Sequence, residues 1–168
     1  LLSMVDRTAE ATSRLNLRCE MLSDSLTGFC NRTGFEEEVE NRLESLLESG
    51  SAKGYAIILI DLARFSRINE SAGAMVGDEL IITVARRLNS RIRSNEILCR
   101  LGGNEFALFV QMDDETTNVR HIAQRLTDAF LKPCQLSSLE IQVDCAAAAA
   151  IGRVGNDDPM DTLRHAQI

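Results

Sequence analysis

The sequence lacks the features of a secreted, membrane-spanning or nucleic-acid-binding chain. None of its apolar runs approaches the roughly 20 residues that cross a bilayer, and no signal-peptide pattern opens it. Its five cysteines are scattered and never spaced as CxxC, which argues against a disulfide framework or zinc site and favours reduced thiols in a cytoplasmic domain. The net charge of −7 argues against broad binding to nucleic acid, although a few local amides suffice for one nucleotide.

The sequence is also poor in proline, with only two residues, whereas 45% of its residues are hydrophobic. This composition predicts one packed domain rather than a disordered chain. We expect a helix over residues 1–23 and a domain over residues 24–168. The abrupt start at Leu1 and end at Ile168 suggest a piece of a larger protein that is truncated at its C-terminal end. Any membrane or sensor segment would then lie outside it.

The first 24 residues read as a single helix. Ala11, Leu15, Leu22 and Leu26 recur at spacings of 4, 7 and 4, with charged residues between them. Two interpretations remain open. The helix packs on its own domain, or it is a signalling stalk that pairs with the same helix of a second copy.

The remaining sequence predicts an α/β (α+β) fold in which helices flank a central, mostly antiparallel sheet. The apolar run 55–62 reads as a buried central strand, and 97–110 reads as a β-hairpin. The run 139–151 contains the closing strands, although Ala146–Ala150 fits a helix as well. Helices are expected after the turn-forming run 24–32, from 64 to 70, after Asp78 as N-cap, from 116 to 131, and from Pro159. The first of these carries Leu47 on its apolar face.

Two carboxylates stand where chemistry is plausible. Asp61 ends the buried strand, and a charge there is costly unless it meets a cation or hydrogen-bond donors. Glu105 follows Gly102, Gly103 and Asn104 at the tip of the hairpin, where glycine allows close approach of a ligand. Asp61 is therefore either a structural hydrogen-bond acceptor or half of a magnesium site shared with Glu105.

Four stretches follow one another in a recognisable order. They are Asp24-Ser25-Leu26-Thr27-Gly28-Phe29-Cys30-Asn31-Arg32, Asp61-Leu62-Ala63-Arg64-Phe65-Ser66-Arg67-Ile68-Asn69-Glu70, Gly73 followed by Gly77-Asp78, and Arg100-Leu101-Gly102-Gly103-Asn104-Glu105-Phe106. These resemble the motifs D-x-L-T-G-L-x-N-R, D-x-D-x-F-K-x-I-N-D, G-H-x-x-G-D and R-x-G-G-D-E-F of the GGDEF family, the diguanylate cyclases. Leu163-Arg164-His165-Ala166 resembles the start of the last helix of that family.

The resemblance implies a palm-like domain that binds one GTP per subunit. By this likeness the catalytic residues are Asp61, Asn104 and Glu105, and magnesium is held by Asp61, the Leu62 carbonyl and Glu105. The backbone around Ala63, Arg64 and Phe65 would cradle phosphates, while Asn69 and Asp78 would bind the guanine edge. In an active enzyme two subunits face each other and condense two GTP into cyclic di-GMP. The resemblance also implies a homodimer, formed by the stalk or the facing sites, and sensor or EAL-type phosphodiesterase domains in the full-length protein.

Four positions depart from the family pattern. Asn104 replaces the acidic metal ligand, and Ala63, Ser66 and Ala74 replace an aspartate, a lysine and a histidine. The departures favour a degenerate, GTP-binding regulatory domain with lost or weak cyclase activity. An active diguanylate cyclase and a structural dimerisation domain without nucleotide are the alternatives.

A further motif concerns cyclic di-GMP itself. Arg93-Ser94-Asn95-Glu96 stands where the family has the R-x-x-D of its inhibitory site, with Glu in place of Asp. Arg93 and Glu96 are therefore candidate ligands of cyclic di-GMP. The alternative is that Arg93 belongs to an arginine-rich helix end with Arg86, Arg87 and Arg91.

Overall fold

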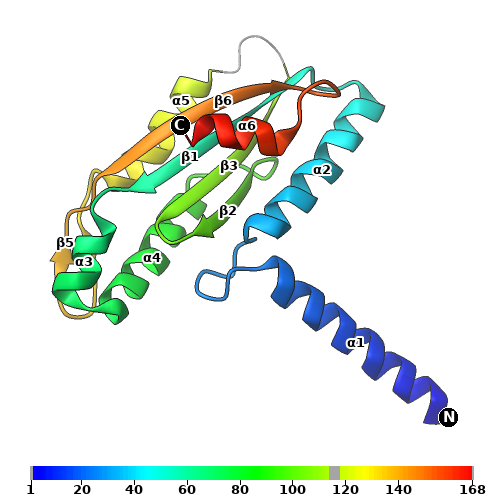
Figure 1. Ribbon diagram of the computed structural model, residues 1–168, viewed down its shortest axis with the longest axis horizontal. Helices are drawn as coiled ribbons and strands as arrows, with labels where there is room; N and C mark the ends of the chain where they lie inside the picture. Colours follow the sequence, from blue (N-terminus) through cyan, green and yellow to red (C-terminus); the bar gives the residue numbers. More distant parts are fainter. Residues whose placement is uncertain (1, 114–117, 168) are drawn as a thin grey trace.

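Strand β1 (Gly54–Leu62) lies at the centre of the sheet, as its apolar run predicts. The computed structural model describes residues 2–113 and 118–167. Its main sheet has four strands in the order β2-β3-β1-β6, and all neighbours are antiparallel (Figure 1). The remaining strands are β2 (Ile97–Gly102), β3 (Glu105–Met112) and β6 (Cys145–Arg153). The predicted hairpin is β2–β3, and the run Ala146–Ala150 is strand rather than helix.

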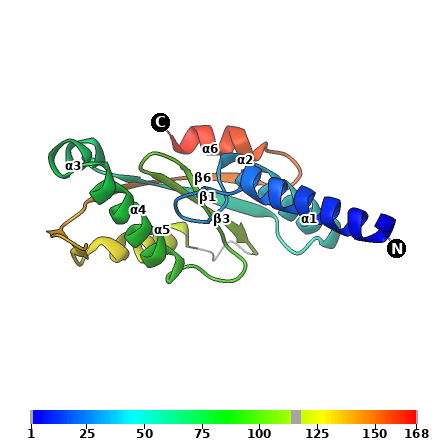
Figure 2. The same ribbon diagram turned by 90° about the horizontal axis from the view of Figure 1, so that it is seen from below.

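Helices cover both faces of this sheet (Figure 2). On one face lie α2 (Arg32–Ser49) and α6 (Pro159–Ala166), and on the other lie α4 (Ala74–Asn89) and α5 (Val119–Thr127). Side chains of β1 alternate between the faces. Tyr55 and Ile57 join the core under α2 and α6, whereas Ile58 and Ile60 join the core under α4 and α5. The predicted fold class is therefore correct.

Smaller elements complete the chain. Helix α3 (Phe65–Ala72) precedes α4, the 3-10 turn η1 (Asp128–Phe130) follows α5, and β4 (Cys134–Gln135) pairs with β5 (Glu140–Ile141). The predicted strand region 139–151 is thus split, because β5 joins a separate two-stranded sheet and β6 alone extends the central one.

Helix α1 (Leu2–Leu22) projects away from the sheet (Figure 1). Every side chain from Asp6 to Met21 is exposed, so the interpretation that this helix packs along its own domain is wrong. The helix also ends before Leu26, which lies in a turn and packs against the core under α4. Among the described helices, α1 included, none combines the length and apolar character needed to cross a membrane.

Three local predictions need correction. Asp78 is not an N-cap, because Gly73, at φ 92°, turns the chain and α4 already begins at Ala74. Leu47 is 61% exposed, since α2 turns only one side of its last turns toward the sheet. The helix expected from residue 116 begins at Val119, after the Asn118 side chain caps it by accepting from the His121 amide. Residues 116 and 117 lie outside the described residues.

Candidate functional site

The two candidate carboxylates lie side by side at one end of the sheet. Asp61 of β1 is the register partner of Glu105 of β3, and directly opposed residues of antiparallel strands point to the same face. Asp61 has the same parity as Ile57 and Leu59, so this is the face covered by α2 and α6. Glu105 accepts a hydrogen bond of 3.4 Å from the Gln167 side chain, just past the end of α6. The structure therefore brings both predicted residues together.

Asn104, at the tip of the β2–β3 hairpin, bonds to the end of β1. Its side-chain nitrogen Nδ2 donates to Asp61 Oδ1 at 2.5 Å and to the Leu62 carbonyl at 2.8 Å. Its own carbonyl accepts from the Leu62 amide at 3.1 Å. Because both side-chain partners are acceptors, the amide nitrogen rather than the oxygen has to face them. Asn104 is thus fixed to the end of β1 by three hydrogen bonds.

In this arrangement a hydrogen-bond donor, and not a divalent ion, bridges the expected ligands Asp61 and Leu62. Magnesium is held by oxygen lone pairs, yet the Asp61 carboxylate and Leu62 carbonyl, the two expected ligands, both accept from the Asn104 N–H groups. An amide N–H offers a partial positive charge at that point and no lone pair. Within residues 2–113 and 118–167, no three His, Cys, Asp or Glu side chains gather as a metal site.

The start of α3 offers open backbone amides beside this site. Arg64 has φ 59° and ψ 22°, the left-handed conformation that non-glycine residues rarely adopt. The amides of Phe65 and Ser66 follow at the helix N-terminus and donate to no backbone acceptor in the described part of the chain. The Ala63 amide differs from the expectation, because it donates to the Asp144 carbonyl at 2.8 Å. It is therefore not open to a phosphate in this structure.

Asn69 of α3 lies against Gly77 of α4, the residue that precedes Asp78. A Cβ built on Gly77 would lie 1.8 Å from Asn69 Oδ1, so only a glycine leaves room for this side chain. Asn69 Oδ1 is buried and has no hydrogen-bond partner among the described residues. Asp78 follows Gly77 on α4 and is exposed. An unpaired buried acceptor is costly, so a donor from a ligand or an ordered water would stabilise it.

Sequence reasoning assigned no role to Arg100, which links the hairpin turn at Gly103 to Asp24. Its guanidinium donates to the Gly103 carbonyl at 3.2 and 2.8 Å and to both carboxylate oxygens of Asp24 at 3.1 and 3.0 Å. Asp24 also accepts from the amide and hydroxyl of Thr27 at 2.9 and 2.7 Å. Burial acts to raise the pKa of Asp24, but the hydrogen bonds from Thr27 and Arg100 outweigh it and lower that pKa. The signal was present, since all three residues belong to the quoted motifs.

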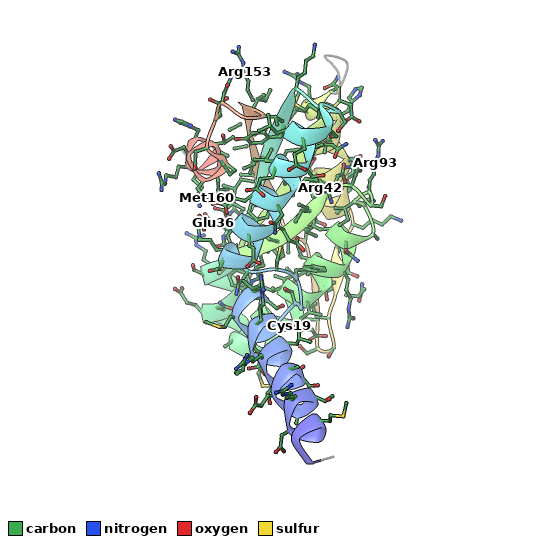
Figure 3. The ribbon with its side chains drawn as sticks, turned by 90° about the vertical axis from the view of Figure 1, so that its right-hand side faces the viewer. Cys19, Glu36, Arg42, Arg93, Arg153 and Met160 are labelled. Atoms are coloured by element: carbon green, nitrogen blue, oxygen red, sulfur yellow. The ribbon has the colours of Figure 1, made fainter. Side chains whose placement is uncertain are left out.

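The two residues of the candidate inhibitory site, Arg93 and Glu96, differ in exposure: Arg93 is exposed and Glu96 is buried. The Glu96 side chain is only 2% exposed and pairs with Arg125 at 2.5 Å, while its second oxygen accepts from the Arg93 amide at 2.7 Å. The Arg93 side chain is exposed and points outward (Figure 3). In this structure Glu96 therefore holds the turn 93–96 and α5 together and is not presented to a ligand.

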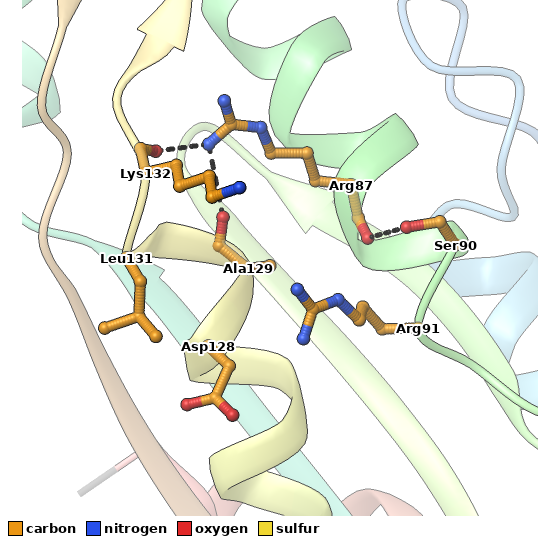
Figure 4. A pocket seen from close by; sticks show the side chains of 7 residues that line it. All are labelled: Arg87, Ser90, Arg91, Asp128, Ala129, Leu131 and Lys132. Carbon is orange, nitrogen blue, oxygen red and sulfur yellow. Dashed lines mark hydrogen bonds between the residues drawn. The ribbon is translucent and has the colours of Figure 1, made fainter.

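The neighbouring arginines have structural contacts as well. Arg87, in the last turn of α4, donates to the carbonyls of Ala129, Lys132 and Pro133 at 3.2, 2.5 and 2.5 Å. It lines a groove of about 360 Å³ between α4 and η1 (Figure 4). Arg86 and Arg87 thus follow the helix-end interpretation, whereas Arg91 and Arg93 lie beyond the helix.

Comparisons with known proteins identify the family of the chain. The family model described as diguanylate cyclase, GGDEF domain, matches residues 21–168. The chain is 33% identical to the cyclic di-GMP phosphodiesterase NbdA of Pseudomonas aeruginosa, over 76% of this chain and 16% of that protein. It is 37% identical to the probable diguanylate cyclase DgcE of Escherichia coli, over 63% of this chain and 9% of that protein. The chain therefore spans less than a fifth of either relative.

A solved structure shows the same fold. The structure comprising only the GGDEF domain of TpbB (YfiN) from Pseudomonas aeruginosa is 28% identical, with a TM-score of 0.76, and the match covers 86% of this chain and 84% of that one. The family is one of cyclic di-GMP signalling proteins whose members use a divalent metal. Since the family model covers nearly the whole chain and the palm-like fold agrees, the chain belongs to the GGDEF family of diguanylate cyclase domains.

Proposed function

We propose that this chain is a cytoplasmic, GTP-binding regulatory domain of a bacterial cyclic di-GMP signalling protein, with lost or weak diguanylate cyclase activity. The observation that carries the proposal is the position of Asn104. Its amide nitrogen donates to the two oxygens, on Asp61 and Leu62, that the family likeness assigns to a metal.

Guanine recognition is supported by the α3–α4 contact. The buried, unpartnered Asn69 Oδ1 accepts from an N–H of the guanine edge, and the exposed Asp78 carboxylate accepts from a neighbouring one. A site built to hydrogen-bond such groups discriminates strongly against a base that lacks them. On this proposal GTP binds in preference to ATP.

Phosphate binding is assigned to the loop before α3. The open amides of Phe65 and Ser66 lie at the N-terminus of α3, where the helix dipole favours negative charge. The left-handed conformation of Arg64 directs the chain into this turn. The family's lysine and histidine are Ser66 and Ala74 here, which removes a cation and a polar group, so we expect weak phosphate affinity.

Catalysis is where the site falls short. Condensing two nucleotides builds negative charge at the attacked phosphate, and losing one group that stabilises such charge commonly costs on the order of 100-fold in rate. Asn104 brings a neutral amide to this position, and its N–H occupies one oxygen of the Asp61 carboxylate. The alternative function, an active diguanylate cyclase, is favoured by one observation: Asp61 and Glu105 remain opposed on the same face.

The partners follow from the projecting helix and from the length of the relatives. The exposed apolar residues of α1, among them Met4 and Leu15 at 76% and 64%, are suited to pairing with the same helix of a second copy. We propose a homodimer formed in this way. Because the chain matches only a short part of NbdA and DgcE, we also propose sensor or phosphodiesterase modules in the full-length protein. Binding of cyclic di-GMP would rely on the exposed Arg93 without Glu96.

Calorimetric titration with GTP tests the proposal. We expect binding in the micromolar to millimolar range whose affinity changes less than threefold when Mg²⁺ is replaced by a chelator, because Asn104 supplies the local positive partial charge. ATP serves as the control ligand and should bind at least tenfold more weakly. If GTP does not bind at millimolar concentration, the proposal is wrong and the remaining alternative is a structural dimerisation domain without nucleotide. A strict requirement for Mg²⁺ would favour the active cyclase.

A further inference from the structure

Cys30 and Cys99 meet although they are far apart in the sequence. Cys30 lies between the turn that follows α1 and the start of α2, and Cys99 lies in β2. The two residues form an isolated parallel bridge. The Cys30 carbonyl accepts from the Arg100 amide at 3.0 Å, and the Cys30 thiol donates to the Leu98 carbonyl at 3.3 Å.

This pairing satisfies the distance that a disulfide requires. Bridged neighbours lie about 5 Å apart and project their side chains to the same side, and disulfides join Cα atoms separated by about 4.4–6.8 Å. Burial, and after it the neighbouring Cys30 thiol, raises the pKa of the Cys99 thiol. Both thiols are free in the structure.

A groove leads to the first of the two thiols. It has a volume of about 500 Å³, lies between α2 and the segment 94–98, and is lined by Cys30 together with Phe29, Arg42 and Glu38. Cys99 is completely buried behind it. A small reagent in this groove therefore reaches Cys30 before Cys99.

We propose that Cys30 and Cys99 form a thiol–disulfide site that takes a low-molecular-weight disulfide of the glutathione type as oxidant. The Cys30 thiolate attacks one sulfur of the oxidant, which forms a mixed disulfide and releases one thiol. Cys99 then loses its proton, and its sulfur attacks the Cys30 sulfur and releases the second thiol. Overall, two protein thiols are oxidised to one disulfide while the reagent is reduced to two thiols.

The bond would act on the junction between α1 and the domain. It would join the segment that follows the Asp24 turn to β2, one residue before Arg100, which holds the hairpin. The second step is expected to be slow at neutral pH and faster at alkaline pH, because burial disfavours the Cys99 thiolate. The reduced state is then the resting form in a reducing compartment.

The test uses the full chain incubated with glutathione disulfide, alkylated under denaturing conditions and mapped by mass spectrometry. We expect one peptide pair joined through Cys30 and Cys99 that dithiothreitol separates, and a Tm about 5 °C higher than that of the reduced chain. Cys19 lies on the projecting helix (Figure 3), so Cys19→Ser should keep both results while Cys30→Ser loses both.

Two outcomes would overturn the inference. One is a stable glutathione adduct on Cys30 with Cys99 still alkylated, which would mean that the sulfurs cannot close. The other is a disulfide that involves Cys19, Cys134 or Cys145 in place of this pair.

Discussion

At the scale of single residues, Asn104 decides how the chemistry of this domain is understood. A carboxylate at this position would repel Asp61 unless a cation lay between them. The amide removes that repulsion and satisfies the Asp61 and Leu62 oxygens directly. One side chain therefore links the Asp61 carboxylate to the Leu62 carbonyl by two hydrogen bonds at the end of β1.

Restoring the acidic residue of the family at position 104 should remove these two hydrogen bonds and restore the need for a cation. Asn104→Asp removes both donated hydrogen bonds and places a second charge beside Asp61, so the site should require a divalent ion. We expect a cyclic di-GMP yield at least tenfold above that of the unchanged chain and GTP binding that now depends on Mg²⁺. Asn104→Ala, which removes the same bonds without adding charge, is the control. Equal yields from the aspartate and alanine variants would mean that the defect lies elsewhere.

A second residue-scale prediction concerns Gly77. A methyl group there would displace the Asn69 side chain, whose Oδ1 lies 1.8 Å from the added atom. Alanine favours a helix interior by about 1 kcal/mol over glycine, so Gly77→Ala should fold with stability close to that of the unchanged chain and lose about tenfold in GTP affinity. Asn69→Ala should lose a similar factor, and the double variant should lose no more than either single one, as calorimetry can check. Additive losses would show that Asn69 and Gly77 act separately.

Residue roles were only partly predictable from the sequence. The proximity of Asp61, Asn104 and Glu105 follows from the strand-and-hairpin pattern together with the family motifs. The direction of the Asn104 amide does not, because it depends on two acceptors that belong to another strand. The pairing of Glu96 was not predictable for a similar reason: its partner Arg125 lies on α5, and no local pattern shows that this pair is buried.

At the scale of elements, the connection between α1 and α2 is the most specific part of the structure. Asn31 caps α2 by accepting from the Gly34 amide at 2.9 Å and donates to the carbonyls of Met21 and Ser23 at the end of α1. A Cβ on Gly34 would lie 2.1 Å from the Leu22 carbonyl oxygen. The first family motif is therefore a structural joint that fixes where α1 leaves the domain.

This joint predicts a pH dependence of stability. The pKa of Asp24 is lowered in the folded state, so its stabilising effect is complete above the unfolded value of about 3.9 and is lost as the pH falls through the folded value. Asp24→Asn should cost about 2 kcal/mol at pH 7, because Arg100 and Thr27 lose a charged acceptor. Denaturant unfolding at pH 7 and at pH 3 should show a difference between the two chains that shrinks in acid. A constant difference would exclude ionisation of Asp24 as the cause.

The element boundaries show where sequence patterns are sufficient. The continuous apolar run of β1 predicts its central position, since a strand buried on both faces has no polar alternation. The start of α4 was misplaced because Gly73 supplies a backbone turn without any capping side chain, so Asp78 was taken for the cap. The small β4–β5 sheet was missed, since two-residue strands have no periodicity to detect.

At the scale of the whole molecule, the chain combines a packed α/β domain with helix α1, whose side chains from Asp6 to Met21 are exposed to solvent. The exposed residues of α1 include Ala11 and Leu15, which lie four residues apart. Near the end of the helix, Arg18 pairs with Glu37 of α2. Arg18 thereby ties the last turns of α1 to the domain.

Dimerisation through this helix can be tested by one substitution. Leu15→Glu places a charge on the apolar stripe and should shift the monomer–dimer equilibrium at least tenfold toward monomer in sedimentation equilibrium. Asn16→Glu, which adds the same charge beside the stripe, should leave the equilibrium unchanged. An equal effect of both variants, or of neither, would mean that α1 is not the contact between copies.

The most direct measurement is the product formed when the unchanged chain is incubated with GTP and Mg²⁺ and its nucleotides are separated by chromatography. With Asn104 bonded to Asp61 and Leu62, we predict bound but unconverted GTP and a cyclic di-GMP yield at least tenfold below that of Asn104→Asp. Cyclic di-GMP and pyrophosphate formed as fast as by that variant would contradict the regulatory assignment and identify the chain as a working cyclase.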